Sequence, residues 1–176
     1  MNSSEREAAL AAMVLRVVDT NRYMTLGTVE ADGLPRLTPV YYTHDAYRTF
    51  YWVSAPDARH SGNIAGQPAI RMVIFDSTTL PGKSDAAYLG ATAHEVPASR
   101  LADECAVAFR STPGGARPFA PEELTGELRL YRADVTEYGV HIRGSHPDFG
   151  TGIDKRAGVA AEAVARAAQR AHRPGA

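Results

Sequence analysis

The residues best suited to chemistry lie in the segment 49–64, where an aromatic strand runs into the start of a short helix. Arg59 offers a planar guanidinium for bidentate contact with a phosphate dianion, and His60 adds a ring donor. The hydroxyls of Ser54 and Ser61, with the N–H groups of the first helical turn, add further donors. This combination predicts an anion pocket. The alternative is that Arg59 and His60 lie on an ordinary solvated helix face.

The strand before this segment, residues 37–42, is expected to lie beside it in a hairpin. Its backbone donors and acceptors would then line one side of a flat ring. Pro39 cannot donate to a strand ladder, so it marks either a sheet edge or a place where a ligand replaces the neighbouring strand. Trp52 has two interpretations in the same way, as a residue beside the ligand or as a core aromatic.

Tight turns connect most of the extended runs that must position these residues. Runs rich in aromatic and β-branched residues predict strands at 23–30, 36–44, 49–54, 69–76, 86–96 and 127–138. Asp32-Gly33 predicts a hairpin between the first two runs, and residues 44–48 form a second tight link. This order predicts a mostly β fold with flanking helices (α+β), built as an antiparallel barrel.

Helical periodicity is confined to segments around these strands. An N-terminal helix is expected, capped by Ser3 or Ser4 with Glu7 as the capping-box partner. Further helices are expected at 56–65, where Pro56 would stand in the first turn, and at 98–109, 122–124 and 159–171. Residues 141–152 are rich in Gly, His and Pro, and no periodicity predicts a regular element there.

Composition favours a single globular domain over residues 1–176. Hydrophobic residues make up 44%, and 19 Lys and Arg against 20 Asp and Glu leave a net charge of −1, which disfavours nucleic-acid binding. One cysteine, Cys105, excludes an intramolecular disulfide and is expected to be a small buried apolar residue. A polar N-terminus and the lack of a long apolar run predict a cytoplasmic chain without a membrane span.

Several chemical motifs fail when their spacing is checked. Gly82-Lys83-Ser84 resembles the end of a phosphate-binding loop, but Ser77 stands where that loop needs its first glycine. His94-Glu95 resembles the start of a zinc helix, but Ala98 occupies the position of the second histidine. The sequence therefore predicts no metal site.

The order of several short motifs resembles the flavin-binding split barrel of the pyridoxamine 5′-phosphate oxidase-like family. The motifs are TLGT at 25–28, DGLP at 32–35, TPVYY at 38–42, FYWVS at 50–54, RHSGNI at 59–64 and GATAHEV at 90–96. The resemblance implies an antiparallel split β-barrel with its core at about 23–138, followed by a tail and helix at 139–176. It also implies a homodimer that binds FMN at the subunit interface. Some relatives use a deazaflavin or haem instead.

The resemblance implies three groups of cofactor-binding residues. The isoalloxazine edge would lie against Thr38, Pro39 and Val40. The ribityl chain would follow Trp52, Val53 and Ser54. The phosphate would bind Arg59 and His60, and a polar side chain facing the cofactor would come from Asn63.

This chain also departs from the family's oxidases. Those enzymes carry an arginine where this chain has Thr38 and a lysine where it has Thr43, so phosphate binding would depend more heavily on Arg59 and His60. Their C-terminal substrate-binding Arg-Leu motif has no counterpart in residues 171–176. The resemblance therefore does not extend to pyridoxamine phosphate as the substrate.

Three functional hypotheses follow. The first is an FMN-dependent oxidoreductase acting on a small organic substrate, and the second is a non-catalytic flavin or haem binder. The third is a deazaflavin enzyme, which would need an additional basic surface, for which the loosely placed candidates are Arg110, Arg117 and Arg129. A substrate lid over the flavin could come from His141, His146, Asp148 and Asp154, or this tail could simply dock on the barrel or the partner.

Overall fold

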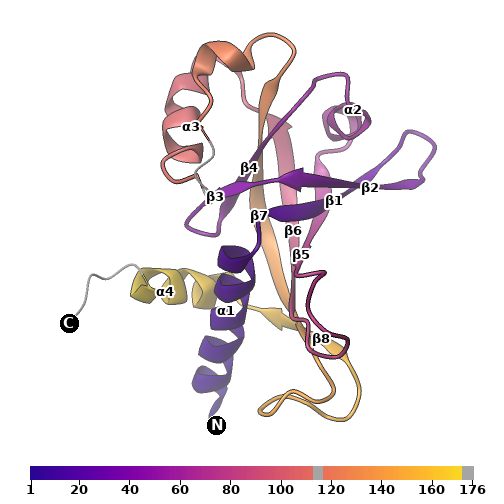
Figure 1. Ribbon diagram of the computed structural model, residues 1–176, viewed down its shortest axis with the longest axis vertical. Coiled ribbons are helices and arrows are strands. Elements are labelled where there is room, and N and C mark those ends of the chain that lie inside the picture. Colours follow the sequence, from indigo (N-terminus) through magenta and orange to yellow (C-terminus); the bar gives the residue numbers. More distant parts are fainter. Residues whose placement is uncertain (113–116, 172–176) are drawn as a thin grey trace.

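The structure is a computed structural model that describes residues 1–112 and 117–171. Its helices are α1 (Ser3–Thr20), α2 (Arg59–Gly66), α3 (Leu101–Ala108) and α4 (Ala161–Ala171), with 3-10 turns at Ala98–Arg100 and Pro121–Leu124. Its strands are β1 (Tyr23–Val29), β2 (Pro35–Tyr41), β3 (Thr43–Asp45), β4 (Thr49–Ser54), β5 (Ala69–Phe75), β6 (Ala86–Glu95), β7 (Arg129–Ile142) and β8 (Lys155–Val159). Figure 1 shows α3 and α2 on either side of the upper strands, and α1 and α4 together beside the lower part of the sheet.

The strands form one antiparallel sheet in the order β2-β1-β5-β6-β7-β4-β3, with β8 pairing on β7. The consecutive strands β2 and β3 lie at opposite ends of this order, although Tyr42 alone separates them in the sequence. The sheet curls until β2 and β4 come into contact, without a hydrogen-bonded ladder joining them. The predicted fold class, a mostly β antiparallel split barrel with flanking helices, is confirmed.

The two predicted tight turns differ in the conformations that they demand. In the β1–β2 hairpin, Gly33 supplies the positive φ of 85°. In the β3–β4 link, two residues with side chains, Ala46 and Tyr47, adopt φ values of 50° and 58°. The second turn therefore holds backbone strain that the first avoids.

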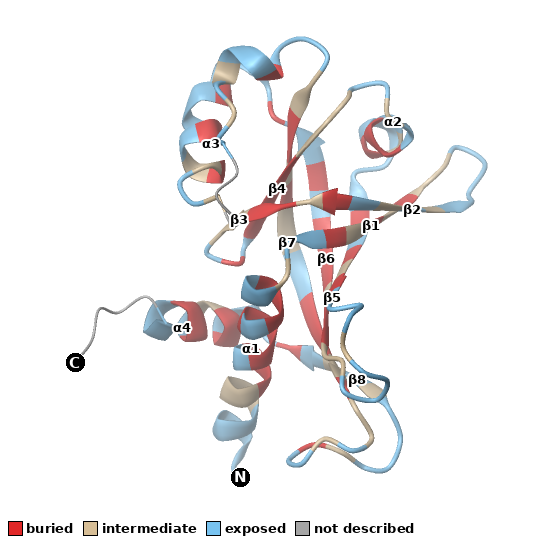
Figure 2. Cartoon of the chain, viewed as in Figure 1, coloured by how far each residue is buried: buried red, intermediate tan, exposed pale blue. Residues whose placement is uncertain are grey.

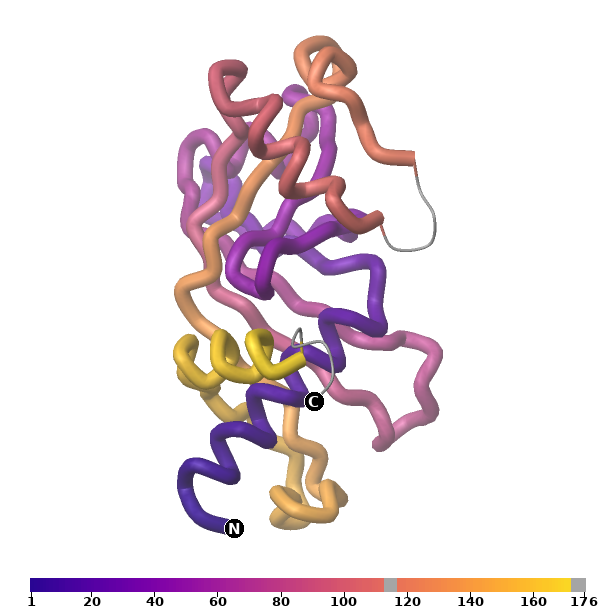
Figure 3. Tube along the Cα trace, turned by 90° about the vertical axis from the view of Figure 1, so that its left-hand side faces the viewer, coloured from indigo at the N-terminus to yellow at the C-terminus, as the bar shows by residue number. Residues whose placement is uncertain are grey.

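Two hydrophobic cores stabilise the barrel. In the larger core, α1 and α4 pack on each other and against the sheet, as two views show (Figures 1 and 3). Figure 2 shows buried residues along one side of α1. The smaller core lies under α3 and consists of Tyr51, Val96, Leu101, Cys105, Ala108, Leu124 and Leu130. Cys105 is buried there, as expected.

Three details of the predicted elements were wrong. The cap of α1 is Asn2, whose side chain accepts from Glu5 N–H while the Glu5 carboxylate accepts from Asn2 N–H, and Ser3 already lies in the helix. Helix α2 begins at Arg59, because Ala58 is extended and the proline at 56 belongs to the turn before it. Strand β8 was missed, because its short sequence of Lys, Arg, Ala and Gly carries little strand propensity and is held by pairing with β7.

The tail predicted from residue 139 onward begins inside a strand, since β7 continues to Ile142. The last helix starts at Ala161, and residues 172–176 lie outside the described residues. None of the helices in the described part of the chain combines the length and apolar character that a membrane-spanning segment needs.

Candidate cofactor site

Arg59 stands at the first position of α2 and keeps its guanidinium at the surface. Its side chain is 69% exposed, and its Nε lies 3.9 Å from the Glu30 carboxylate. Glu30 makes a closer ion pair with Arg36, so its contact with Arg59 is the weaker of the two. In the first turn of α2, the Ser61 N–H already donates to the Ala58 carbonyl, which leaves the N–H groups of Arg59 and His60 without a backbone acceptor among the described residues. This end of α2 can therefore receive an anion through Arg59.

His60, the second predicted phosphate ligand, points into the protein. Its Nε2 lies 2.9 Å from Ser54 Oγ, and burial lowers the pKa of the imidazole, so the ring is neutral at neutral pH. Ser61 is buried beside it and donates to the Ala55 carbonyl. These contacts fix the link between β4 and α2. In this conformation His60 positions the loop and offers an anion no charge.

Asn63, one turn further along α2, also faces the barrel. Its side-chain amide donates to Thr28 Oγ1 at 3.0 Å. The contact ties α2 to β1, because Thr28 is buried in that strand. Asn63 therefore helps to hold Arg59 in place, and its amide is already engaged.

The residues predicted along the isoalloxazine edge, Thr38, Pro39 and Val40, lie on β2 at the end of the sheet order. Pro39 is exposed, which fits its predicted place on an edge strand. Val40 is buried in the larger core. Because successive side chains of a strand point to opposite faces, Pro39 faces away from Thr38 and Val40. A ring could meet all three only along the strand edge.

Trp52 and Val53 line a cavity of about 340 Å³, which we call the aromatic cavity. Its other lining residues are Tyr41, Thr43, Tyr51, Phe109, Thr112, Arg117, Phe119 and Leu128. The Trp52 ring stacks on Tyr131, with 5.6 Å between ring centroids. This cavity has the size and apolar lining of a small-molecule site.

Two buried polar atoms of residues that line the aromatic cavity, Trp52 Nε1 and Thr43 Oγ1, have no hydrogen-bond partner among the described residues. A buried polar group without a partner costs about 1–3 kcal/mol. By contrast, the Tyr51 hydroxyl donates to Glu104 at 2.7 Å, and burial together with this bond raises the pKa of the phenol. The Trp52 side chain belongs to the larger core, whereas its strand neighbours Tyr51 and Val53 pack on the smaller core, so the indole N–H points away from those two side chains.

The sequence analysis missed the wall of the aromatic cavity that follows α3. Phe109 and Phe119 meet there with 5.8 Å between ring centroids, and the Arg117 guanidinium lies over the Phe119 ring while binding Glu123 through two hydrogen bonds. Two phenylalanines beside a Pro/Gly-rich segment were the available signal. No pattern in the sequence indicated that they reach β4.

The structure brings together only part of the predicted set. Trp52 and Val53 share the aromatic cavity, and Ser54 lies beside His60 at the start of α2. Arg59 and His60 are outside the lining of the aromatic cavity, as are the three residues on β2. Within one chain, the predicted residues therefore lie in two separate places. One is the exposed Arg59 guanidinium at the start of α2, and the other is the aromatic cavity beside β4.

The tail and the three additional arginines are engaged elsewhere. His141 pairs with Asp154 at 3.3 Å, beside β8 at the end of the molecule remote from α2 (Figure 1). The arginines proposed for a deazaflavin tail each face a carboxylate, with Arg110 on Asp45, Arg117 on Glu123 and Arg129 on Glu95. These pairs reduce the basic surface available to an acidic ligand.

Comparison with known sequences defines the family. The sequence model described as pyridoxamine 5′-phosphate oxidase matches residues 10–141, which is more than half of the chain. The chain therefore belongs to the pyridoxamine 5′-phosphate oxidase family, as the motifs in its sequence indicated. No curated protein sequence matches it.

Solved structures confirm the fold. A haem-binding protein from Mycobacterium smegmatis matches with a TM-score of 0.62 and 18% identity, covering 90% of this chain and 60% of that one. A candidate 5-nitroimidazole antibiotic resistance protein from Bacteroides thetaiotaomicron matches with a TM-score of 0.61 and 9% identity, covering 73% and 81%. The haem storage protein HutZ from Vibrio cholerae matches with a TM-score of 0.54 and 15% identity, covering 81% and 98%. At these identities the likeness concerns the fold alone.

Proposed function

We propose that this chain is an FMN-binding oxidoreductase that acts on a small organic substrate. The observation that carries the proposal is the aromatic cavity of about 340 Å³ beside β4, the strand that leads to Arg59 at the start of α2. A flavin ring is planar, so it would pack against the aromatic and aliphatic side chains that line this cavity. Membership of a family named for an oxidase supports the assignment.

Arg59 is the proposed phosphate ligand. Its guanidinium is exposed beside the first-turn N–H groups of α2, and its long contact with Glu30 is readily exchanged for a dianion. Ser54, on the strand that carries Trp52, would lie between ring and phosphate. His60 would act indirectly by holding Ser54 and the loop, so the phosphate charge depends on Arg59.

A bound flavin supplies the redox chemistry, while the protein supplies binding and orientation. Tyr51 and Val53 would pack against the ring, and Phe109 and Phe119 would shield it from water. Among the described residues around the aromatic cavity we assign no acid or base, because transfer of a hydride needs none.

We further propose that the chain forms a homodimer with the cofactor at the subunit interface. The register pairs Tyr23 with Tyr41 and Gly27 with Leu37, so these side chains share the outer face of the sheet. Tyr23 is 63% and Leu37 71% exposed, which leaves an apolar strip on the single chain. Tyr41 also lines the aromatic cavity, so a partner covering this strip would reach the cofactor.

The absorption spectrum of the purified protein tests the cofactor. After incubation with FMN and removal of the excess, we expect the two-band spectrum of a bound flavin, and anaerobic addition of a reduced nicotinamide should bleach it. A Soret band would assign haem, as the names of two structural neighbours suggest for those proteins. A single band would assign a deazaflavin. No retained FMN would contradict the proposal, and retention without bleaching would leave a flavin carrier.

A further inference from the structure

A small cluster of charged side chains, which we call the Glu30 cluster, lies beside the start of α2. It consists of Glu30, Arg36 and Arg59. The β1–β2 hairpin carries the first two, since Glu30 directly follows β1 and Arg36 is the second residue of β2. Figure 1 shows α2, which carries Arg59, close to this hairpin. Two guanidiniums therefore share one carboxylate at the place where we propose that the phosphate binds.

The strand register directs the Arg36 side chain toward α2. Arg36 is paired with Thr28 across the hairpin, so the two side chains lie on the same face of the sheet. Thr28 is buried on that face and accepts from the Asn63 amide of α2. The Glu30 carboxylate reaches the same face, because it contacts Arg36 there. The charged groups of the hairpin are therefore on the side that α2 covers.

The two arginines hold the Glu30 carboxylate unequally. Arg36 Nε donates to Glu30 Oε1 in the closest contact of the cluster, whereas Arg59 Nε lies 3.9 Å from Glu30 Oε2. The Glu30 side chain is only 18% exposed, so the carboxylate is held against the hairpin. The Arg59 guanidinium has no hydrogen-bond partner among the described residues. Glu30 thus belongs to Arg36, and Arg59 keeps its donors available.

Charge balance shows why this division matters. In the cluster, one carboxylate faces two guanidiniums, which leaves one positive charge uncompensated for an anion. Without Arg36, the nearest cation to Glu30 would be Arg59, and a rotation of the Glu30 side chain would close that ion pair and neutralise the site. We propose that Arg36 is a positioning residue that holds Glu30 and so keeps Arg59 free for the phosphate. The inference rests on the proposed function, and it gives Arg36 no contact with the phosphate.

The ratio of FMN affinity to riboflavin affinity, measured by fluorescence titration, tests the inference because it separates the phosphate from the ring. Arg36→Ala should lower this ratio about fivefold, the upper range for one exposed ion pair, since Glu30 then pairs with Arg59. Riboflavin affinity should stay the same. Adding Glu30→Gln to Arg36→Ala should return the ratio to within about twofold of wild type, because the competing charge is gone. Arg166→Ala, which removes an exposed arginine paired with Glu7, is the control and should leave the ratio unchanged.

Several results would overturn the inference. An unchanged ratio in Arg36→Ala would show that Glu30 does not compete for Arg59. A lower ratio that Glu30→Gln does not restore would make Arg36 a direct phosphate ligand, and an equal loss of FMN and riboflavin affinity would make it a purely structural residue. If Arg36→Ala does not fold, Arg36→Gln takes its place, because it removes the same charge. The proposed function fails, and this inference with it, if wild type does not prefer FMN or if Arg59→Ala keeps the preference.

Discussion

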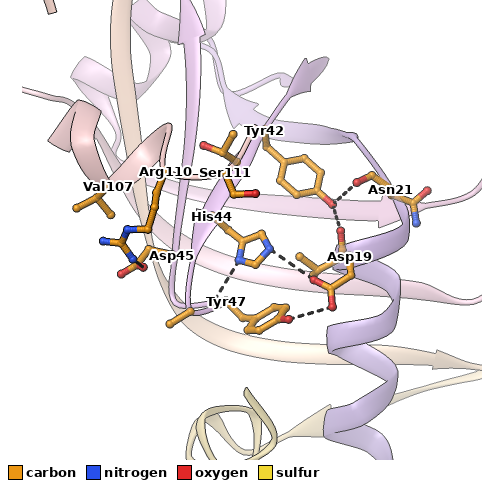
Figure 4. Close-up of a pocket in the computed structure, with 12 residues that line it drawn as sticks. Asp19, Asn21, Tyr42, His44, Asp45, Tyr47, Val107, Arg110 and Ser111 are labelled. Atoms are coloured by element: carbon orange, nitrogen blue, oxygen red, sulfur yellow. Dashed lines mark hydrogen bonds and ion pairs between the residues drawn. The ribbon is translucent and has the colours of Figure 1, made fainter. Parts of the chain in front are cut away.

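The start of α2 and the β3–β4 turn hold their charged groups in opposite ways. At α2, the cationic group is exposed, and Ser54, Arg59, His60 and Asn63 come from one short stretch of chain. At the strained β3–β4 turn, the Asp19 carboxylate accepts from the Tyr47 hydroxyl and pairs with His44, although Asp19 belongs to α1 (Figure 4). A local site can be recognised from its motif. A site assembled by folding becomes visible only when the turn geometry is known.

The largest expected effect is a loss of FMN affinity when the charged group at the start of α2 is removed. Arg59→Ala should weaken FMN binding by about 2–4 kcal/mol, the cost of losing charge-assisted contacts to a dianion. The barrel should remain folded, because the guanidinium is exposed and its only close carboxylate, among the described residues, also binds Arg36. Equilibrium dialysis measures the affinity. Arg170→Ala, an exposed arginine on α4, is the control, and an equal loss in both variants would refute the phosphate assignment.

The next effect tests whether the strained turn is held by buried contacts. Tyr138→Phe leaves the Tyr47 carbonyl without its donor and should lower the free energy of unfolding by about 1–3 kcal/mol. Urea denaturation measures this change. Tyr23→Phe removes a hydroxyl from an exposed ring and should have little effect. FMN affinity should be unchanged in Tyr138→Phe, and a large loss of FMN binding would show that the two regions are not independent.

A smaller effect tests the strain itself. Ala46→Gly should raise the free energy of unfolding by about 0.5 kcal/mol, because relief of the left-handed backbone slightly exceeds the added entropy of glycine. Ala106→Gly, in α3 and exposed, should instead lower it by about 0.5–1 kcal/mol. Thermal denaturation of both variants gives the signs. Destabilisation by both would argue against strain at position 46.

The last prediction concerns how the free energy of unfolding changes with pH. Burial lowers the pKa of His60, so the unfolded chain takes up this proton at a higher pH than the folded protein does. The stability from neutral His60 is present above the unfolded pKa and is lost as the pH falls through the folded pKa. The difference in unfolding free energy between wild type and His60→Gln should therefore shrink between about pH 7 and pH 5. A difference that grows on acidification would mean that the buried ring is charged.

The fold was largely predictable because strand periodicity and turn residues are local signals. Gly33 indicated its hairpin, and the aromatic run before α2 indicated β4. Strand β8 gave no such signal, because pairing with β7 decides its structure. A helix after β4 was predicted, but it begins at Arg59 and not near Pro56, and the inward orientation of His60 depends on which helix face the barrel covers.

Neither the aromatic cavity nor the left-handed turn could be predicted from the sequence. Phe109 and Phe119 complete the aromatic cavity only because α3 packs beside β4. The left-handed turn at Ala46 and Tyr47 gave no signal, since neither residue favours that conformation and buried contacts impose it.

Comparison of FMN with riboflavin in wild type and Arg59→Ala tests the central claim most directly, because the two ligands differ only in the phosphate. Fluorescence titration of both proteins gives the four affinities. We expect wild type to prefer FMN over riboflavin by about 30-fold or more, which corresponds to about 2 kcal/mol, and Arg59→Ala to bind both about equally. The same preference for FMN in the two proteins would contradict the account, since the phosphate would then bind elsewhere than at the start of α2.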